Sequence, residues 1–322
     1  MSQKTCLISV FPLLRTFGNG VLFVFLRTKT DSRCIFQCVA ARFFVRRSVP
    51  SWNQKEHGRH GVPTEQMKVV FQMEEIKTIM QQNWNKNASR YDAQYQHGLH
   101  SEEEKAAWLR LLGSLIPEKG QMILDVGAGT GFLSLLLAEQ GHWIKAVDLS
   151  PGMLEKAEEK AQDAGLIDKI TFAIGDAENL AEPDSMYDVV VNRHLLWAMP
   201  DPDRAITEWR RVLKPGGKLI LIDGDWHYNS LKNNVKIFCG KFLTLVSERK
   251  NMFRKYRSET AGRLPMTKPE NAKKAPDMVR KAGFRVTVRG AEEIEAAEKR
   301  AMPLRARLLN PYHRIIIIGI KE

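Results

Sequence analysis

The feature that most constrains this chain is an apolar run that ends in a glycine-rich turn. Met122 to Val126 is long enough for a buried parallel strand. Gly127, Gly129 and Gly131 follow it at two-residue spacing. Glycine allows a positive φ and leaves no Cβ between the backbone and a ligand. We therefore expect the backbone to approach a bound molecule closely at this turn.

The next segments predict a helix and a second strand. Thr130 to Gln140 is apolar and helix-permissive, and Gly141 is a natural stop. Free amides at the start of such a helix favour a carboxylate or a phosphate. Asp148 ends the next apolar run, 23 residues after Asp125. A carboxylate at that strand tip can accept hydrogen bonds from ribose hydroxyls, so the pattern predicts a site for a ribose-containing cofactor.

The glycine spacing separates two classes of cofactor. The dinucleotide fingerprint is G-x-G-x-x-G. Counted from Gly127 it requires glycine at Phe132, and counted from Gly129 it requires glycine at Ser134. The pattern in this chain is D-x-G-x-G-x-G, which resembles motif I of class I S-adenosylmethionine (SAM)-dependent methyltransferases. A nicotinamide dehydrogenase is therefore disfavoured.

Further segments resemble the motifs of this family in the expected order. The matching segments are a ribose-binding turn, an adenine-binding turn, a fourth strand, and a helix with the fifth strand, at Val147 to Leu154, Ile174 to Glu178, Tyr187 to Asn192, and Trp209 to Ile220. The resemblance is good over residues 84–225, loose over 226–322, and absent from about the first 70. Within the family, the chain is most similar to the group that includes ubiquinone/menaquinone-biosynthesis enzymes.

Strands alternate with helices along this part of the chain, which predicts an α/β fold with a doubly wound parallel sheet. The resemblance implies a seven-stranded, mostly parallel sheet with helices on both faces. Phe284 to Arg289 and Arg314 to Ile320 would be strands six and seven, with strand seven antiparallel beside strand six. Residues 226–266 hold a helical, basic insertion after strand five. Ligands sit at the carboxyl ends of such strands, so we expect a substrate lid here; a solvated charged face is the alternative.

The resemblance also implies which residues hold the nucleoside half of SAM. Asp148 would bind the ribose hydroxyls, and Leu149 would pack on adenine. Asp176 would accept a hydrogen bond from the adenine amino group, with the Ala177 amide beside it. The residues alone allow another interpretation, in which Asp176 is a helix N-cap.

The methionine half would lie at the glycine turn. There Gly127, Gly129 and Gly131 would let the backbone approach, and Asp125 would meet the methionine amino group directly or through water. Asn192 and Arg193 would line the same end. The segment Asn83 to Asp92 resembles the W-x₃-A-x₂-Y-D entry segment of small-molecule methyltransferases, in which the tyrosine, here Tyr91, lies over the cofactor. Core aromatics of a capping helix are the alternative.

Candidate groups for the acceptor follow strand four. An unperturbed histidine titrates near pH 6.5, so His194 can accept a proton from a hydroxyl or an amine. A structural histidine bonded to a loop is the alternative. Trp197, His227 and Tyr228 are further candidates for the substrate pocket. No metal site is expected, because the four cysteines include only one C-x₃-C pair.

The net charge of +12 is concentrated near the N-terminus, because residues 1–72 hold 11 Lys/Arg and 3 Asp/Glu. We expect a basic N-terminal extension over residues 1–72 and a methyltransferase domain over 73–322. The extension could be a disordered tail, a product of a start assigned upstream of Met67 or Met73, a transit peptide, or a basic arm. Its apolar run, Val21 to Leu26, is too short for a membrane span. The expected location is the cytoplasm, or an organelle if residues 1–50 are a transit peptide.

The sequence thus predicts methyl transfer from SAM to a small molecule by in-line displacement. An RNA methyltransferase is the enzymatic alternative, although a net charge of +4 over the remaining 250 residues gives it modest support. A SAM-binding module without turnover is the alternative from another class. DNA is not an expected substrate, since the end of strand four lacks the N/D-P-P-Y/F motif and no Pro-Cys pair is present. The acceptor atom and the oligomeric state stay open.

Overall fold

The structure is a computed structural model that describes residues 24–30, 33–39, 64–224, 231–248, 262–267, 273–310 and 313–322. The chain divides into two compact units, Met1–Gly61 and Val62–Glu322. In the first unit, strands β1 (Val24–Thr30) and β2 (Arg33–Val39) form an antiparallel hairpin in which Val24 is opposite Val39.

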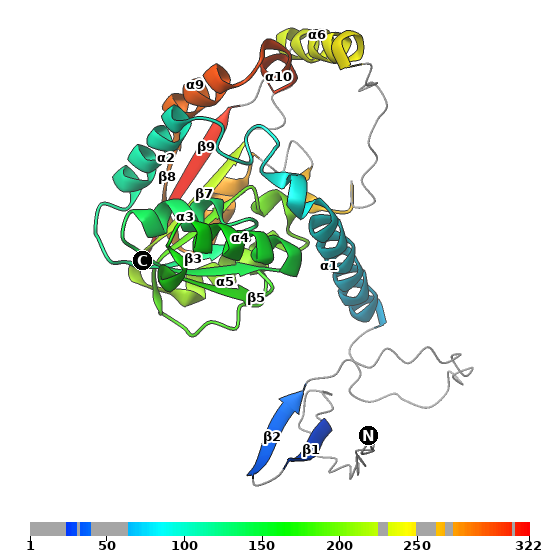
Figure 1. Ribbon diagram of the computed structural model, residues 1–322, viewed down its shortest axis with the longest axis vertical. Helices are drawn as coiled ribbons and strands as arrows, with labels where there is room; N and C mark the ends of the chain where they lie inside the picture. Colours follow the sequence, from blue (N-terminus) through cyan, green and yellow to red (C-terminus); the bar gives the residue numbers. More distant parts are fainter. Residues whose placement is uncertain are drawn as a thin grey trace, which may run out of the picture. The chain divides into compact units, whose positions relative to one another are not determined.

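The second unit is built on a seven-stranded sheet (Figure 1). Its strands, in chain order, are β3 (Met122–Val126), β4 (Trp143–Asp148), β5 (Ile170–Ile174), β6 (Tyr187–Arg193), β7 (Leu213–Gly224), β8 (Phe284–Gly290) and β9 (Arg314–Lys321). The order across the sheet is β5-β4-β3-β6-β7-β9-β8. All pairs are parallel except those of β9, which runs antiparallel to both neighbours. The expected doubly wound sheet, with its last strand inserted antiparallel beside the sixth, is confirmed.

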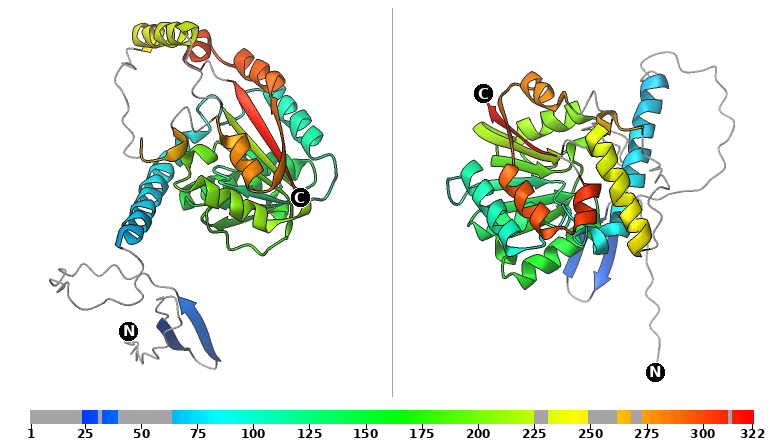
Figure 2. Two further views of the ribbon diagram at one scale, coloured as in Figure 1. Left: turned by 180° about the vertical axis from the view of Figure 1, so that it is seen from behind. Right: turned by 90° about the horizontal axis from the view of Figure 1, so that it is seen from above.

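Helices cover both faces of this sheet (Figures 1 and 2). The helices are α1 (Thr64–Tyr91), α2 (Glu102–Leu115), α3 (Phe132–Glu139), α4 (Pro151–Asp163), α5 (Pro202–Val212), α6 (Leu231–Glu248), α8 (Ala275–Lys281), α9 (Glu292–Ala301) and α10 (Leu304–Leu309), with short 3₁₀ turns η1 (Ile167–Lys169), η2 (Leu196–Ala198) and η3 (Pro265–Thr267). In the part of the chain that the structure describes, no helix combines the length and the apolarity that a bilayer crossing requires.

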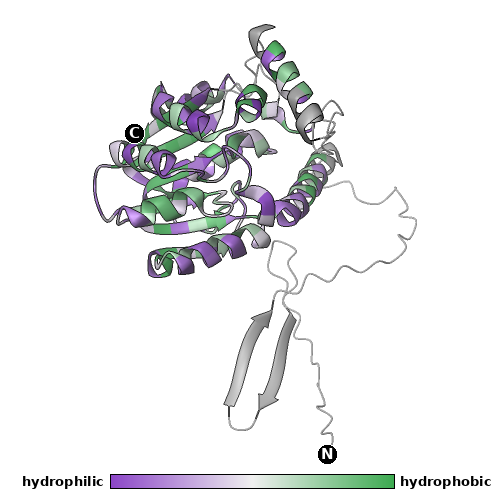
Figure 3. Cartoon of the chain, turned by 45° about the horizontal axis from the view of Figure 1, so that its top comes forward, coloured by the Kyte–Doolittle hydropathy of each residue, from purple (hydrophilic) through white to green (hydrophobic). Residues whose placement is uncertain are grey.

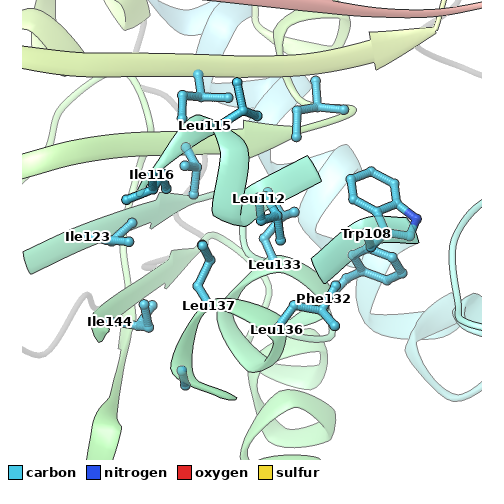
Figure 4. Close-up of a cluster of buried hydrophobic side chains, with 14 of the residues drawn as sticks. Trp108, Leu112, Leu115, Ile116, Ile123, Phe132, Leu133, Leu136, Leu137 and Ile144 are labelled. Carbon is cyan, nitrogen blue, oxygen red and sulfur yellow. The ribbon is translucent and has the colours of Figure 1, made fainter. Parts of the chain in front are cut away.

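Two hydrophobic clusters, one on each face, hold the helices to the sheet. Side chains alternate along a strand, so in β3 Ile123 belongs to one cluster, whereas Leu124 belongs to the other. The Ile123 cluster joins α2, α3 and α9, with Trp108 at one end (Figure 4). The Leu124 cluster joins α5 and α8. Figure 3 shows the apolar strands enclosed by helices whose hydrophilic residues lie on the outside.

Helix ends follow the local sequence signals closely. Ser101 caps α2 and accepts a hydrogen bond from the Glu104 amide, and the Glu104 carboxylate in turn accepts from the His100 amide. Ser150 caps α4 by accepting from the Met153 amide. In the sequence, Ser101 with Glu104 three residues later, and Ser150 before Pro151, are the signals that predict these two helix starts.

Three local expectations were wrong. Helix α3 begins at Phe132 rather than Thr130, because Gly131 is left-handed at φ 79° and forms the N-cap. Helical spacing in the sequence also places Ala164 on the inward face of α4, but it is exposed, because α4 ends one residue before it. The same spacing places Leu213 on the buried face of α5, but Leu213 is buried as the first residue of β7.

The residue types from Met73 to Trp84 predict a helix, and α1 extends beyond both ends of that stretch, from Thr64 to Tyr91. The domain boundary between residues 72 and 73 stays a prediction. The helical insertion expected after strand five is present as α6, which packs beside α10, where a Cβ on Gly240 would lie 2.9 Å from the side chain of Leu309 (Figure 2).

Strand order places a crevice beside β3. The chain runs outward from β3 through β4 to β5, and then returns to β6 on the other side of β3. Ligands of open α/β sheets bind at the carboxyl ends of the two strands where the order reverses. Here those ends carry the glycine turn after Val126 and the pair Arg193 and His194 after β6.

Candidate active site

The glycine turn after β3 has the geometry that close approach of a ligand requires. Gly127, Gly129 and Gly131 all have positive φ, at 67°, 56° and 79°. A Cβ on Gly129 would meet nothing within 4 Å, so this residue faces open space. A Cβ on Gly131 would instead lie 2.9 Å from that of Ala157. Gly129 therefore leaves room for a ligand, and Gly131 leaves room for α4.

A solvent-open cavity lies at this turn, with about 760 Å³ of empty space that includes the solvent at its mouth. We call it the cofactor cavity. Nine of the twelve residues predicted for the site line it: Tyr91, Gly127, Gly129, Asp148, Leu149, Asp176, Ala177, Arg193 and His194. Asp125 lines a smaller adjoining recess, together with Gly127 and Arg193. Gly131 and Asn192 line neither of these spaces.

Asp148 is fixed by two backbone donors. Its Oδ2 accepts from the Gly129 amide and its Oδ1 from the Ser150 amide, each at 2.8 Å. Burial raises the pKa of this carboxyl, and the amide bonds oppose that rise. The Leu149 amide also favours the charged form of Asp148. A carboxylate has about four acceptor sites, so Asp148 can still accept from a ligand hydroxyl.

Asp125 lies below the turn and is fully buried. Its carboxylate accepts from the Ser134 hydroxyl at 2.6 Å. Burial raises its pKa to about 6, although the Ser134 hydroxyl and amide favour the charged form. Asp125 therefore supports the turn and faces the recess at its base.

Helix α1 closes the far end of the cofactor cavity through Lys77, a residue that the sequence analysis did not identify. Its Nζ lies 2.8 Å from Asp176 Oδ2 and 2.6 Å from Glu178 Oε2. Burial opposes charge on Lys77, but the two carboxylates raise its pKa. Asp176 also accepts from the Glu178 amide at 2.9 Å. It starts a turn and not a helix, so it is not a helix N-cap.

Three more hydrogen bonds, made by two side chains of α1, hold this helix over the segment that follows β4. The Gln81 amide donates to the Leu149 carbonyl at 2.7 Å. Asn85 Oδ1 accepts from the Ser150 hydroxyl at 2.6 Å and from the Gly152 amide at 3.0 Å. The second half of α1 is therefore part of the wall around Asp148 and Leu149.

A second, larger cavity of about 1490 Å³ adjoins the first, and we call it the acceptor cavity. Trp84, Tyr91 and His194 line both cavities. Most of the other lining side chains are apolar: Leu196, Trp197, Leu221, Met266, Ala275, Pro276, Val288, Ile315 and Ile317. Charged side chains in the lining are Asp223 and Lys273. Trp197 lines this cavity, whereas His227 and Tyr228 fall outside the described residues.

The predicted lid over residues 226–266 is described in part. Met266 lines the acceptor cavity, but the described side chains of α6 line neither cavity. The remainder of the predicted lid lies outside the described residues. The lid therefore stays a prediction.

Two neutral histidines stand at the junction of the cavities. His194 has a left-handed φ of 58° and is 8% exposed. Its ring lies edge-on to that of His97, with centroids 5.5 Å apart. Burial, and then the positive charges of Arg193 and Arg314, lower the pKa of His194 well below its ordinary value and that of His97 to about 4.

Arg193 occupies the floor between these groups. Its guanidinium stacks 3.4 Å above the Phe132 ring and donates to the carbonyls of Gln96, at 3.0 Å, and His97, at 2.6 Å. Arg193 therefore ties the segment after α1 to the end of β6. Asn192, the residue before it, is buried in the sheet.

The fold and the site together define a Rossmann-like domain for a nucleoside cofactor, with an acceptor cavity beside it. Residues 124–221 match the family model described as "Methyltransferase domain". Residues 124–221 therefore carry a class I SAM-dependent methyltransferase domain.

Among curated proteins, the chain is similar to the ubiquinone/menaquinone biosynthesis C-methyltransferase of Vibrio vulnificus. The two are 36% identical over 108 residues, which are 32% of this chain and 41% of that protein. The chain thus spans about two fifths of the length of the curated relatives that it matches.

Solved structures are more distant. Phospholethanolamine N-methyltransferase 2 of Haemonchus contortus is 20% identical with a TM-score of 0.47, covering 66% of this chain and 52% of that one. A SAM-dependent methyltransferase of Aquifex aeolicus is 18% identical with a TM-score of 0.44, covering 66% of this chain and 88% of that one.

Proposed function

We propose that the protein transfers the methyl group of SAM to a small-molecule acceptor. The observation that carries this proposal is the junction of the two cavities at Trp84, Tyr91 and His194. A donor in one cavity and an acceptor in the other would meet there. Methyl transfer from a sulfonium is an in-line displacement, in which the enzyme chiefly aligns the nucleophile about 3 Å from the carbon.

The geometry supports a division of the cofactor cavity into two ends. Asp148 retains acceptor sites for the ribose hydroxyls, and Leu149, Asp176 and Ala177 line the end proposed for adenine. The methionine half would lie over Gly127 and Gly129, with Asp125 and Arg193 below and Tyr91 beside it. In this proposal Gly131 and Asn192 act through packing, because neither lines a cavity.

A small molecule fits the acceptor cavity better than a polynucleotide. Among the described residues, the lining is mainly aromatic and aliphatic, and its charged side chains are Asp223 and Lys273. RNA binding relies on clustered Lys and Arg side chains, and residues 73–322 hold 38 Lys/Arg against 34 Asp/Glu. The similarity to the Vibrio vulnificus enzyme also favours a small molecule, although it covers only part of each chain.

We propose the cytoplasm as the location of the protein, on the basis of the sequence analysis.

The cofactor assignment is tested with the substitution Asp148→Asn. Hydrogen bonds to a charged group contribute about 1.5–3 kcal/mol, so calorimetry should show SAM affinity falling by roughly 10- to 100-fold. Asp188→Asn is the matched control, because Asp188 lies at the opposite end of the parallel strands and pairs with Lys214. Its SAM affinity should stay within about twofold. Equal affinities for wild type and Asp148→Asn would refute the assignment.

Turnover is tested separately. The purified protein, incubated with SAM and a cell extract freed of macromolecules, should release S-adenosylhomocysteine. Release only when the RNA fraction is added would favour the RNA alternative, and tight SAM binding with no release from any fraction would favour a binding module without turnover.

A further inference from the structure

Three charged side chains meet at the far end of the cofactor cavity. Lys77 Nζ lies 2.8 Å from Asp176 Oδ2 and 2.6 Å from Glu178 Oε2. All three residues line the cavity at the end proposed for adenine. One ammonium group of α1 therefore bridges two carboxylates that stand beside the proposed position of the purine ring.

The two carboxylates are held to different degrees. The Glu178 side chain is 2% exposed, and its Oε1 accepts from the Asp201 amide at 2.6 Å. The Asp176 side chain is 28% exposed, and its Oδ1 accepts from the Glu178 amide at 2.9 Å. Of the two groups, the carboxylate of Asp176 is the one that can turn toward solvent.

Lys77 sets the direction of the Asp176 carboxylate in two ways. Its ammonium binds Oδ2 directly, and its positive charge offsets the repulsion between Asp176 and Glu178, which both contact the same nitrogen. Lys77 is itself held in place, because Gln81 and Asn85, roughly one and two turns further along α1, bond to the segment after β4. Without Lys77, the like charges would drive Asp176 out toward water.

The direction of Asp176 matters because of what a carboxylate can recognise. An ionised carboxylate accepts hydrogen bonds and donates none. A 6-amino purine presents N–H donors on its exocyclic nitrogen, whereas a 6-oxo purine presents a carbonyl oxygen at the same place. A carboxylate that faces this position therefore bonds to the first purine and repels the second.

We propose that Lys77 is a positioning residue for cofactor selection. It holds the Asp176 carboxylate toward the purine, so that the site takes the 6-amino nucleoside of the methyl donor and rejects its 6-oxo counterpart. The inference rests on the proposed function. It assigns part of the choice of purine to α1, outside the strand ends that carry the glycine turn and Asp148.

The inference is tested with two nucleosides that differ at the purine 6-position. S-adenosylhomocysteine and S-inosylhomocysteine are titrated into the whole protein in a calorimeter, so the assay requires no acceptor and no turnover. Wild type should prefer the adenosyl compound by roughly 10- to 100-fold, the contribution of a hydrogen bond to a charged group. Lys77→Met should lower this ratio by about 10-fold, mainly through weaker binding of the adenosyl compound.

Two further variants of the same residue complete the test. Lys77→Arg keeps a cation that can bind both carboxylates, so it should keep the ratio within about threefold of wild type. Lys77→Gln removes the charge but keeps a donor for the buried Glu178. The ratio should fall in this variant too, so the inference stays testable if Lys77→Met does not fold.

The matched control is Lys156→Met. Lys156 pairs with Glu159 on the exposed surface of α4 and lines neither cavity, so this variant should keep the wild-type ratio. A merely structural role of Lys77 would weaken both compounds equally and leave the ratio unchanged. An unchanged ratio in Lys77→Met and Lys77→Gln, or an equal fall in Lys156→Met, would overturn the inference.

Asp176→Asn separates this inference from the proposed function. Asparagine donates as well as accepts, so this variant should lower the ratio whether or not Lys77 is involved. If Asp176→Asn lowers the ratio and the loss of the Lys77 charge does not, the inference fails while the proposed function stands. If wild type binds neither compound, or Asp176→Asn leaves the ratio unchanged, the cofactor assignment in the proposed function fails instead.

Discussion

The ion pairs of Lys77 join α1 to the wall of the cofactor cavity, and their loss should weaken the fold measurably. In Lys77→Met, the chain length and apolar stem are kept while two contacts, 2.8 Å to Asp176 and 2.6 Å to Glu178, are removed. The Glu178 side chain is 2% exposed, so its carboxylate would lose a buried partner. A hydrogen bond to a charged group contributes about 1.5–3 kcal/mol.

Part of that loss is offset in the variant. Asp176 is 28% exposed, so water can replace Lys77 there. Glu178 keeps a hydrogen bond from the Asp201 amide at 2.6 Å. We therefore expect Lys77→Met to lower the free energy of unfolding by about 2–3 kcal/mol, the contribution of one buried charged contact. For a unit of this size that corresponds to a fall in Tm of roughly 4–12 °C.

The assay is urea unfolding of the cofactor-free protein, with Lys156→Met as the matched control. Lys156 forms an equally short pair with Glu159, 2.6 Å away, but on the exposed surface of α4. Pairs of that kind contribute little, so the control should unfold like wild type. If the two variants lose the same stability, α1 is not held to the cavity wall in the way that the structure shows.

Three further outcomes follow from the same geometry. Gly129→Ala should lower SAM affinity measured by calorimetry, because the new Cβ enters the cofactor cavity. Gly131→Ala should lower Tm with little direct effect on the cofactor contacts, because its Cβ meets Ala157. A larger loss of SAM affinity in Gly131→Ala than in Gly129→Ala would contradict the assignment. For His97 the folded-state pKa, about 4, lies below the unfolded value, so the unfolded chain binds more protons between pH 4 and 6.5 and stability falls as pH falls through that window. His97→Gln should therefore reduce the slope of stability against pH by up to about 1.4 kcal/mol per pH unit. The free energy of unfolding is measured at several pH values, and the same pH dependence in wild type and His97→Gln would rule this out.

Much of the sheet was predictable, because most of its strands are recognisable as short apolar runs. The same regularity located Asp148 and Asp176, which lie at the carboxyl ends of the parallel strands β4 and β5 and therefore at one edge of the sheet. The glycine turn was predictable for the same reason, and its spacing carried the cofactor class.

The remaining site residues come from contacts that are distant in sequence. Arg314 heads an apolar strand, and nothing in the run Arg314 to Ile320 indicates that its side chain reaches His194, 120 residues away. Lys77 lies on a helix with many charged neighbours, and its partner Asp176 is 99 residues away. Lys77 meets Asp176 because α1 packs against the domain, and Arg314 meets His194 because β9 pairs with β7. No local sequence pattern could identify these groups.

The surroundings of His194 show the same limit. A histidine after the fourth strand is a candidate for a base, because its residue type and position both allow that role, and this stays a prediction. The sequence does not indicate that Arg314 Nη1 lies 3.2 Å from its Nε2, because that contact depends on β9 lying beside β7.

The central claim is that the glycine turn and the two strand-end carboxylates hold SAM rather than a dinucleotide. It is tested most directly by titrating SAM and NAD separately into the purified protein in a calorimeter. The account predicts saturable binding of SAM at one site per chain and no heat of binding for NAD. Saturable binding of NAD with none of SAM would contradict it.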